Sequence, residues 1–219
     1  MRERWSHLET SASRAETVPD DAVWYAAYGS NLDPDRFGRY LLGGSPPGAT
    51  RTYPGTRAGG PALDTRPFAM PGRLVFAWHS PTWDGSIAFH DPTGEGEVLS
   101  TAYLLPTGTF SDVVEQEMWR EPGADHDLAE VLATGRQVLG PGRYETLHLT
   151  GELDGRPVVT FSADDPALLE PGRPAPAYLA TMARGLRHAH RLEDDAIADY
   201  FLLAAGIAYD RDAVLRAIR

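Results

Sequence analysis

A glycine turn near the start of the chain is the first place where residue types and spacing could do chemistry. Residues 25–28 suit a short strand, Gly29 accepts backbone angles that other residues resist, and Asp33-Pro34 is a favoured helix start. The N–H groups of 29–31 would then lie ahead of a helix N-terminus, where they can bind a carboxylate or phosphate without a basic side chain. An ordinary strand-to-helix turn has the same residues, so both interpretations stay open here.

Glu117 is the second candidate, in a helix expected over Phe110 to Trp119. Counting by three and four places Glu117 on the apolar stripe with Val113 and Val114, whereas Gln116 points elsewhere. A carboxylate turned inward loses hydration of its charged form, which suits it to accept a proton near neutral pH. Glu117 is therefore a candidate general base.

A structural role is the alternative for Glu117. An inward glutamate is often the partner of an arginine, and Arg73 or Arg120 could hold Glu117 in an ion pair. The two interpretations differ in geometry, because a catalytic Glu117 has to face the same cavity as residues 29–31.

The composition excludes several kinds of chemistry. All 20 basic residues are arginine, so neither a Walker-type phosphate loop nor Schiff-base catalysis, both of which need lysine, can operate within these 219 residues. There is no cysteine for a disulfide, a thiolate nucleophile or a thiolate-bound zinc, and we expect no metal ligand set. The net charge of −11, with no basic run, argues against a nucleic-acid partner.

The organisation of the chain follows from its polarity. The N-terminal segment has no signal-peptide pattern, and no apolar run is long enough for a membrane span, so we expect a soluble, cytoplasmic protein without a membrane partner. Residues 1–21 are polar and predict a flexible arm, and residues 22–219 predict a single domain. Within that domain Gly43 to Gly72 is rich in glycine and proline and predicts a long loop, a candidate lid. Nothing in the sequence indicates the oligomeric state.

The remaining elements follow from periodicity and turn residues. Strands are expected at 73–79, 86–90, 98–105, 144–149 and 157–161, with Asp154-Gly155 as a hairpin turn. Helices are expected at 34–42, 127–134, 175–186, 193–206 and 210–218, besides that of Glu117. The result is a mixed α/β (α+β) fold.

The order of several motifs resembles the γ-glutamylcyclotransferase-like family. The motifs are Tyr28-Gly29-Ser30-Asn31 after the first strand, Gly72-Arg73-Leu74 entering a later strand, Tyr103-Leu104 before the Glu117 helix, and Pro174 to Leu179 at a late helix start. The resemblance extends over most of the chain from Val23 onward. In one respect the chain departs from the family, because Met118 follows Glu117 where the family normally has glycine, which implies a different pocket rim.

The resemblance implies a mixed α/β barrel flanked by helices, and an enzyme that needs no cofactor. Its substrate would be a small γ-glutamyl amide, whose α-amine attacks its own γ-carbonyl to release 5-oxoproline and a free amine. Glu117 would be the catalytic acid and base. The substrate-binding residues would be Tyr28, Gly29, Ser30, Asn31, Leu32 and Tyr178.

Two other functions stay open. A hydrolase or amide-processing tailoring enzyme could use the same scaffold, with water or another amine as nucleophile. A non-catalytic protein could keep the turn at Gly29 to bind a carboxylate metabolite.

Overall fold

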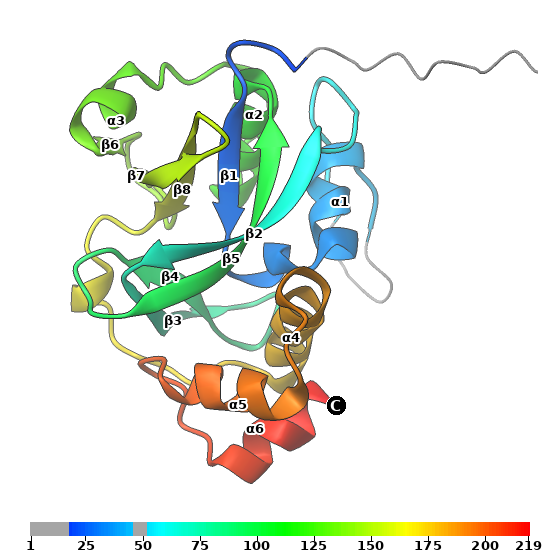
Figure 1. Ribbon diagram of the computed structural model, residues 1–219, viewed down its shortest axis with the longest axis vertical. Coiled ribbons are helices and arrows are strands. Elements are labelled where there is room, and N and C mark those ends of the chain that lie inside the picture. The colour runs from blue at the N-terminus through cyan, green and yellow to red at the C-terminus, as the bar shows by residue number, and fades with distance from the viewer. Residues whose placement is uncertain (1–17, 46–51) are drawn as a thin grey trace, which may run out of the picture.

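The computed structural model describes residues 18–45 and 52–219. The elements, in chain order, are β1 (Val23–Ala27), a 3₁₀ turn η1 (Ser30–Leu32), α1 (Pro34–Leu42), β2 (Asp64–Pro71), β3 (Arg73–Ser80), β4 (Gly85–Asp91), β5 (Glu97–Leu105), α2 (Thr107–Glu117), α3 (Ala129–Thr134), β6 (Arg136–Val138), β7 (Thr146–Leu153), β8 (Arg156–Ser162), a 3₁₀ turn η2 (Pro166–Leu168), α4 (Pro176–His190), α5 (Asp194–Leu202) and α6 (Arg211–Ile218). The expected mixed α/β fold is confirmed (Figure 1). The expected arm lies mostly outside the described residues.

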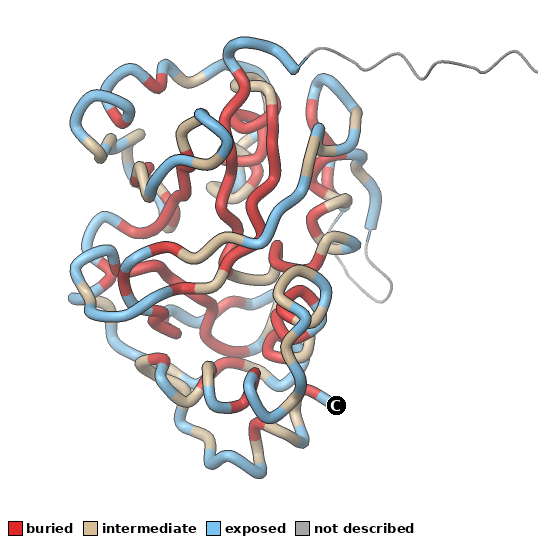
Figure 2. The backbone as a smooth tube through the Cα atoms, in the orientation of Figure 1, coloured by how far each residue is buried: buried red, intermediate tan, exposed pale blue. Residues whose placement is uncertain are grey.

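A six-stranded mixed sheet forms the centre of the fold, in the order β2-β5-β1-β8-β7-β6. β1 pairs antiparallel with β5 and parallel with β8, with Tyr25 opposite both Tyr103 and Val159. All five residues of β1 are buried because the strand is flanked on both sides, and Figure 2 shows β1 and β5 as buried over most of their length. β1 therefore holds the glycine turn that follows it on a rigid strand.

The expected barrel is corrected to an open sheet. Its edge strands, β2 and β6, do not pair with each other. β2 carries Pro67 and Pro71, which have no N–H to donate, and most of its residues are exposed or half-buried. These prolines suit β2 to an open edge rather than to a closing strand.

β2 also corrects the expected loop from Gly43 to Gly72. Residues 64–71 pair with β5 along its whole length, from Asp64 opposite Leu104 to Pro71 opposite Glu97. The part of that loop at 46–51 lies outside the described residues.

β3 and β4 form a separate two-stranded antiparallel sheet. The chain leaves β2 for β3 at Gly72, whose φ of +126° and close approach to the Asp91 carbonyl exclude a side chain. The N–H of His90 on β4 donates to Ser162 Oγ on β8 at 3.1 Å, which joins the two sheets. The β3–β4 sheet therefore forms a wall beside the carboxyl end of β1.

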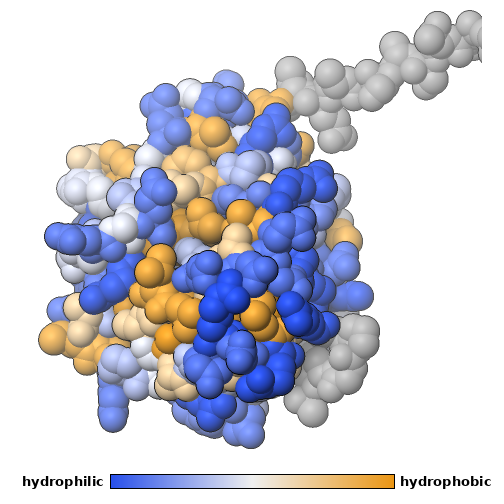
Figure 3. All heavy atoms as spheres, turned by 60° about the horizontal axis from the view of Figure 1, so that its bottom comes forward, coloured by the Kyte–Doolittle hydropathy of each residue, from blue (hydrophilic) through white to orange (hydrophobic). Residues whose placement is uncertain are grey.

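The helices lie around the sheets. α4 packs on η1, and α5 and α6 extend that group at the lower end of the molecule in Figure 1. On the face in Figure 3, apolar side chains lie in groups interrupted by hydrophilic ones. Among the described residues, no helix is long and apolar enough to cross a membrane.

Two buried histidines lie between the sheets and predict acid sensitivity. The rings of His90 and His148 are 6.2 Å apart, and neither His90 Nδ1 nor His148 Nε2 has a hydrogen-bond partner in the described chain. Burial, with the positive fields of His90 and Arg136, lowers the pKa of His148 to about 4. Since an unfolded histidine titrates near about 6.5, the unfolded state binds more protons between these values. Stability should then fall by roughly 1–3 kcal/mol as the pH drops from about 6.5 to about 4.

Urea denaturation at several pH values checks this prediction. His148→Gln should weaken the dependence of the free energy of unfolding on pH. His188→Gln, at an exposed position on α4, should leave this dependence unchanged. An equally steep loss of stability in His148→Gln would contradict the assignment.

Candidate functional site

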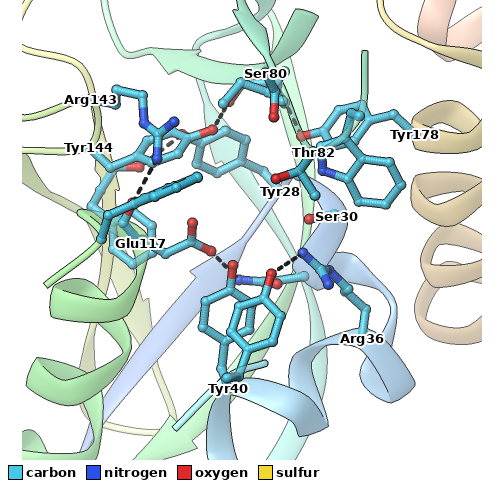
Figure 4. A pocket seen from close by; sticks show the side chains of 18 of the residues that line it. Tyr28, Ser30, Arg36, Tyr40, Ser80, Thr82, Glu117, Arg143, Tyr144 and Tyr178 are labelled. Carbon is cyan, nitrogen blue, oxygen red and sulfur yellow. Dashed lines mark hydrogen bonds between the residues drawn. The ribbon is translucent and has the colours of Figure 1, made fainter. Parts of the chain in front are cut away.

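One cavity collects most of the residues singled out from the sequence. Its empty space is about 600 Å³ when the open solvent at its mouth is included. Its lining residues are Tyr25, Tyr28, Gly29, Ser30, Asn31, Arg36, Tyr40, Tyr53, Ser80, Thr82, Trp83, Ile87, Ala88, Glu117, Trp119, Arg143, Tyr144, Phe161 and Tyr178. Figure 4 shows Glu117 and Arg36 approaching from opposite sides, from α2 and α1.

The glycine turn follows the carboxyl end of β1, as expected. In the described chain, no backbone carbonyl accepts a hydrogen bond from the N–H groups of Gly29, Ser30 or Asn31. Asp33 caps α1 by accepting from the N–H of Asp35 at 3.0 Å. The turn therefore presents backbone donors to the cavity at the start of two successive helical segments.

Glycine is needed at position 29 for a different reason from the unusual backbone angles that the sequence suggested. Its φ is −101°, so no left-handed conformation is needed. A Cβ atom there would instead lie 2.8 Å from the hydroxyl oxygen of Tyr178. Gly29 therefore allows Tyr178, on α4, to approach the turn closely.

Tyr178 is held as a hydrogen-bond donor to the cavity. Its hydroxyl oxygen accepts from the N–H of Ala88 at 3.0 Å and also interacts with the backbone of Ser30. Burial raises the pKa of this hydroxyl, so the group stays protonated. Because its oxygen is already used as an acceptor, its proton remains for a ligand.

Glu117 faces the glycine turn. Its Oε1 accepts a hydrogen bond from Asn31 Nδ2 at 2.8 Å, and both residues line the cavity. The Oδ1 atom of Asn31 is buried without a partner among the described residues. An oxygen of Asn31 and the carboxylate of Glu117 thus form a pair of acceptors, which suits an ammonium group.

Neither arginine suggested as a structural partner holds Glu117. Arg73 pairs with Asp91 at 2.8 Å, and Arg120 lies 3.6 Å from Glu115. The orientation expected for Gln116 is corrected, because its side chain is fully buried and donates to the Tyr40 carbonyl. α2 is buried around most of its circumference, so its apolar stripe alone could not show which polar residues turn inward.

Two of the expected substrate-binding residues have other contacts. Leu32 is fully buried and does not line the cavity, and its N–H donates to the Gly29 carbonyl at 3.0 Å. Tyr28 lines the cavity, but its hydroxyl donates to the Phe161 carbonyl at 2.8 Å. Leu32 thus fixes the turn from within, and Tyr28 joins β1 to β8.

Arg36 was missed by the sequence argument. Its guanidinium donates to the Tyr53 hydroxyl and lies 4.9 Å from the centre of the Tyr53 ring and 5.4 Å from that of Trp83. Its Nε atom is buried without a partner in the described chain. Arg36 lies in the first turn of α1, and its place in the cavity depends on its packing against Tyr53 and Trp83, which no local spacing indicates.

Arg143, Trp119 and Tyr144 were also missed. Arg143 donates to the Glu117 carbonyl at 3.4 Å, and Tyr144 donates to the Ala88 carbonyl at 2.9 Å. These residues come from two loops far from the glycine turn in sequence, so no local spacing could have indicated them. Within the described ranges, no group of three His, Asp or Glu side chains is placed to hold a metal ion.

Comparison of the sequence with known sequences does not show a family for the chain. No protein-family model matches the chain. A curated relative, histone deacetylase 5 of Arabidopsis thaliana, is 28% identical over 206 residues, which cover 85% of this chain. The same alignment covers 31% of the relative, so the chain spans about a third of its length.

Two solved structures match almost the whole chain. A γ-glutamyl cyclotransferase superposes with a TM-score of 0.51 at 14% identity, over 89% of this chain and 98% of that one. An uncharacterised protein from Homo sapiens gives 0.50 at 15% identity, over 90% and 99%. The resemblance found in the sequence is confirmed at the level of structure: this chain has the fold of γ-glutamyl cyclotransferase.

Proposed function

We propose that the protein is a cofactor-independent γ-glutamyl cyclotransferase that cleaves a γ-glutamyl amide into 5-oxoproline and a free amine. One observation carries the proposal: the Glu117 carboxylate and the turn at residues 29–31 line one cavity, joined by the 2.8 Å hydrogen bond from Asn31. This arrangement offers an anion site next to a base, as the α-carboxylate and α-ammonium of a glutamyl group require.

The substrate's charged α-carbon groups fit opposite sides of this arrangement. The α-carboxylate would accept hydrogen bonds from the N–H groups of residues 29–31. The α-ammonium would donate to Glu117 and to the unpartnered Oδ1 of Asn31. Holding both groups fixes the α-carbon, so that the side chain can curl until the amine reaches its own γ-carbonyl.

Glu117 would carry the protons. It takes one from the ammonium, and the resulting amine attacks the γ-carbonyl carbon, moving the π electron pair onto oxygen. The protonated Glu117 then donates to the nitrogen of the leaving amine as its bond to that carbon breaks. The second proton lost by the attacking nitrogen also ends on the leaving amine, so the reaction consumes neither water nor a net proton.

Tyr178 would stabilise the negative oxygen that forms during the attack. Its donor proton is positioned by two backbone interactions, from Ala88 and Ser30, before substrate binds. A preorganised donor costs little reorganisation as charge develops.

The test is incubation with a panel of γ-glutamyl amides and amino acids, with 5-oxoproline and glutamate measured separately. Release of 5-oxoproline supports the proposal. Release of glutamate instead would indicate hydrolysis on the same scaffold, and no product from any compound would leave carboxylate binding as the better explanation.

Tyr178→Phe should lower kcat by about 10- to 10³-fold, because it removes one oxyanion donor. The fold should persist, since the ring remains. Tyr200→Phe is a matched control, because the Tyr200 hydroxyl also accepts from a backbone N–H, that of Leu99 at 3.2 Å, but lies outside the cavity. Steady-state assays of both variants give the comparison, and equal losses would contradict a role for Tyr178 in the reaction.

A further inference from the structure

A second hollow adjoins the cavity, and we call it the aromatic shelf. Its lining residues are Trp78, Pro81, Met118, Trp119, Gly142 and Arg143. Trp119 and Arg143 line both the shelf and the cavity, so the two hollows are neighbours. In Figure 4, Arg143 lies across the cavity from Ser30 and Arg36, on the side of Glu117.

The two tryptophans of the shelf have backbone conformations that disfavour them. Trp78 has φ +50° and Trp119 has φ +63°, in the left-handed region where non-glycine residues are rare. Trp119 follows Met118, the C-cap residue of α2, and glycine is the usual residue at this position after a helix. Their side chains are 38% and 56% exposed, so burial offsets little of this strain. Strained residues of this kind cluster at functional sites.

Arg143 lies between the two rings. Its guanidinium carbon is 4.2 Å from the centre of the Trp78 ring and 5.0 Å from that of Trp119. In the part of the chain that the structure describes, no carboxylate pairs with it. Its hydrogen bond to the Glu117 carbonyl ties it to the end of α2. The shelf thus offers aromatic faces and an uncompensated positive charge beside the candidate base.

We infer that the aromatic shelf binds the leaving amine of the substrate, and that this amine is an aromatic α-amino acid. The inference rests on the proposed function. With the glutamyl group held between residues 29–31 and Glu117, the leaving amine would lie on the side of Trp119 and Arg143, which line both hollows. The ring of the amino acid stacks on an exposed face of Trp119 or Trp78, and its carboxylate pairs with Arg143.

Charge argues against other amines. A diamine or a lysine side chain would bring a second positive charge close to Arg143, which disfavours it. A small amino acid such as alanine would satisfy Arg143 but leave both exposed tryptophan faces uncovered. An aromatic amino acid matches both features of the shelf.

The experiment compares kcat/KM for three substrates: γ-glutamylphenylalanine, γ-glutamylalanine and γ-glutamylphenylalanine amide. The alanine compound lacks the ring, and the amide lacks the second carboxylate. We expect kcat/KM for γ-glutamylphenylalanine to exceed that for each of the other two compounds by about 5- to 30-fold, the effect of one stacked ring or one charged hydrogen bond.

Two variants separate the contributions. Trp119→Gly should remove the preference for phenylalanine over alanine, so that the ratio of the two kcat/KM values falls to about 1, whatever the change in the absolute rate of either compound. Arg143→Gln should remove the preference for phenylalanine over its amide. Arg191→Gly is the control, because Arg191 ends α4 with φ +58° and is exposed outside both hollows. Both glycine variants should be at least as thermally stable as the parent, and only Trp119→Gly should change the substrate preference.

The outcomes separate this inference from the proposed function. Equal turnover of the phenylalanine and alanine compounds, or an equal loss for both in Trp119→Gly, would overturn the inference and leave the cyclotransferase proposal intact. If no compound yields 5-oxoproline, the proposed function fails, and calorimetric titration then tests whether the shelf binds an aromatic amino acid. Tighter binding of γ-glutamylphenylalanine than of γ-glutamylalanine, with the difference lost in Trp119→Gly, supports the inference. Equal binding of the two compounds overturns it.

Discussion

Glu117→Gln is expected to reduce the release of 5-oxoproline by about 10²- to 10⁴-fold, the usual contribution of a general acid and base. The substitution keeps the shape of the side chain and an oxygen that can accept from Asn31 Nδ2, so the 2.8 Å contact with the glycine turn can persist. What is lost is the ability to take the ammonium proton. Single-turnover rates, with thermal denaturation to show an intact fold, measure the effect.

Glu115→Gln is the matched control on the same helix. Glu115 accepts from His126 Nε2 at 2.8 Å and does not line the cavity, so this variant should keep the parent rate. A well-folded Glu117→Gln protein with parental turnover would contradict the mechanism. An equal loss in both variants would point to a general disturbance of α2 instead.

Elements with local start and stop signals could be predicted from the sequence. Asp33-Pro34 predicts the start of α1, and the structure begins that helix at Pro34 with the Asp33 cap in place. The hairpin of β7 and β8 turns at Asp154-Gly155, where both residues have positive φ, as the sequence predicts. In both cases a few adjacent residues determine the conformation.

The strand β2 could not be predicted in that way. Pro67 and Pro71 argue against a central strand, and nothing local shows that an edge position tolerates them. Its pairing with β5 supplies the hydrogen bonds and fixes it as a strand. The same edge leaves the sheet open where the resemblance implied a barrel.

The residues of the candidate site also differ in whether local sequence signals could indicate them. The turn at Gly29 and the inward Glu117 carry local signals, and the structure brings them together. Arg36, Arg143 and Trp119 reach the cavity wall only through tertiary packing of α1, α2 and the loop before β7. The departure at Met118 indicated a different rim, but only the structure shows the arginine between two tryptophans.

Gly185→Ala should have the largest effect on stability, because α4 crosses the glycine turn at this residue. An added Cβ would lie 2.3 Å from the carbonyl carbon of Leu32 and 2.4 Å from its Cβ. These atoms belong to the backbone and the fully buried core, so they cannot move aside without shifting η1 or α4. We expect a loss of about 3 kcal/mol, the upper end for overpacking, and a fall in Tm of about 6–12 °C for a chain of this size.

The same substitution should also disturb the site, because Tyr178 lies on α4 and Asn31 precedes Leu32 in η1. Gly38→Ala, in α1, is the matched control: a Cβ there meets no atom within 4 Å. It should stabilise the protein by about 0.5–1 kcal/mol, as alanine does in an unobstructed helix. Urea denaturation and 5-oxoproline assays of both variants test the pair. Shifts of the same sign would show that helix propensity, rather than contact with the turn, determines the effect at Gly185. Opposite signs, with activity lost only in Gly185→Ala, would show that the close packing of α4 on η1 holds both the fold and the anion site.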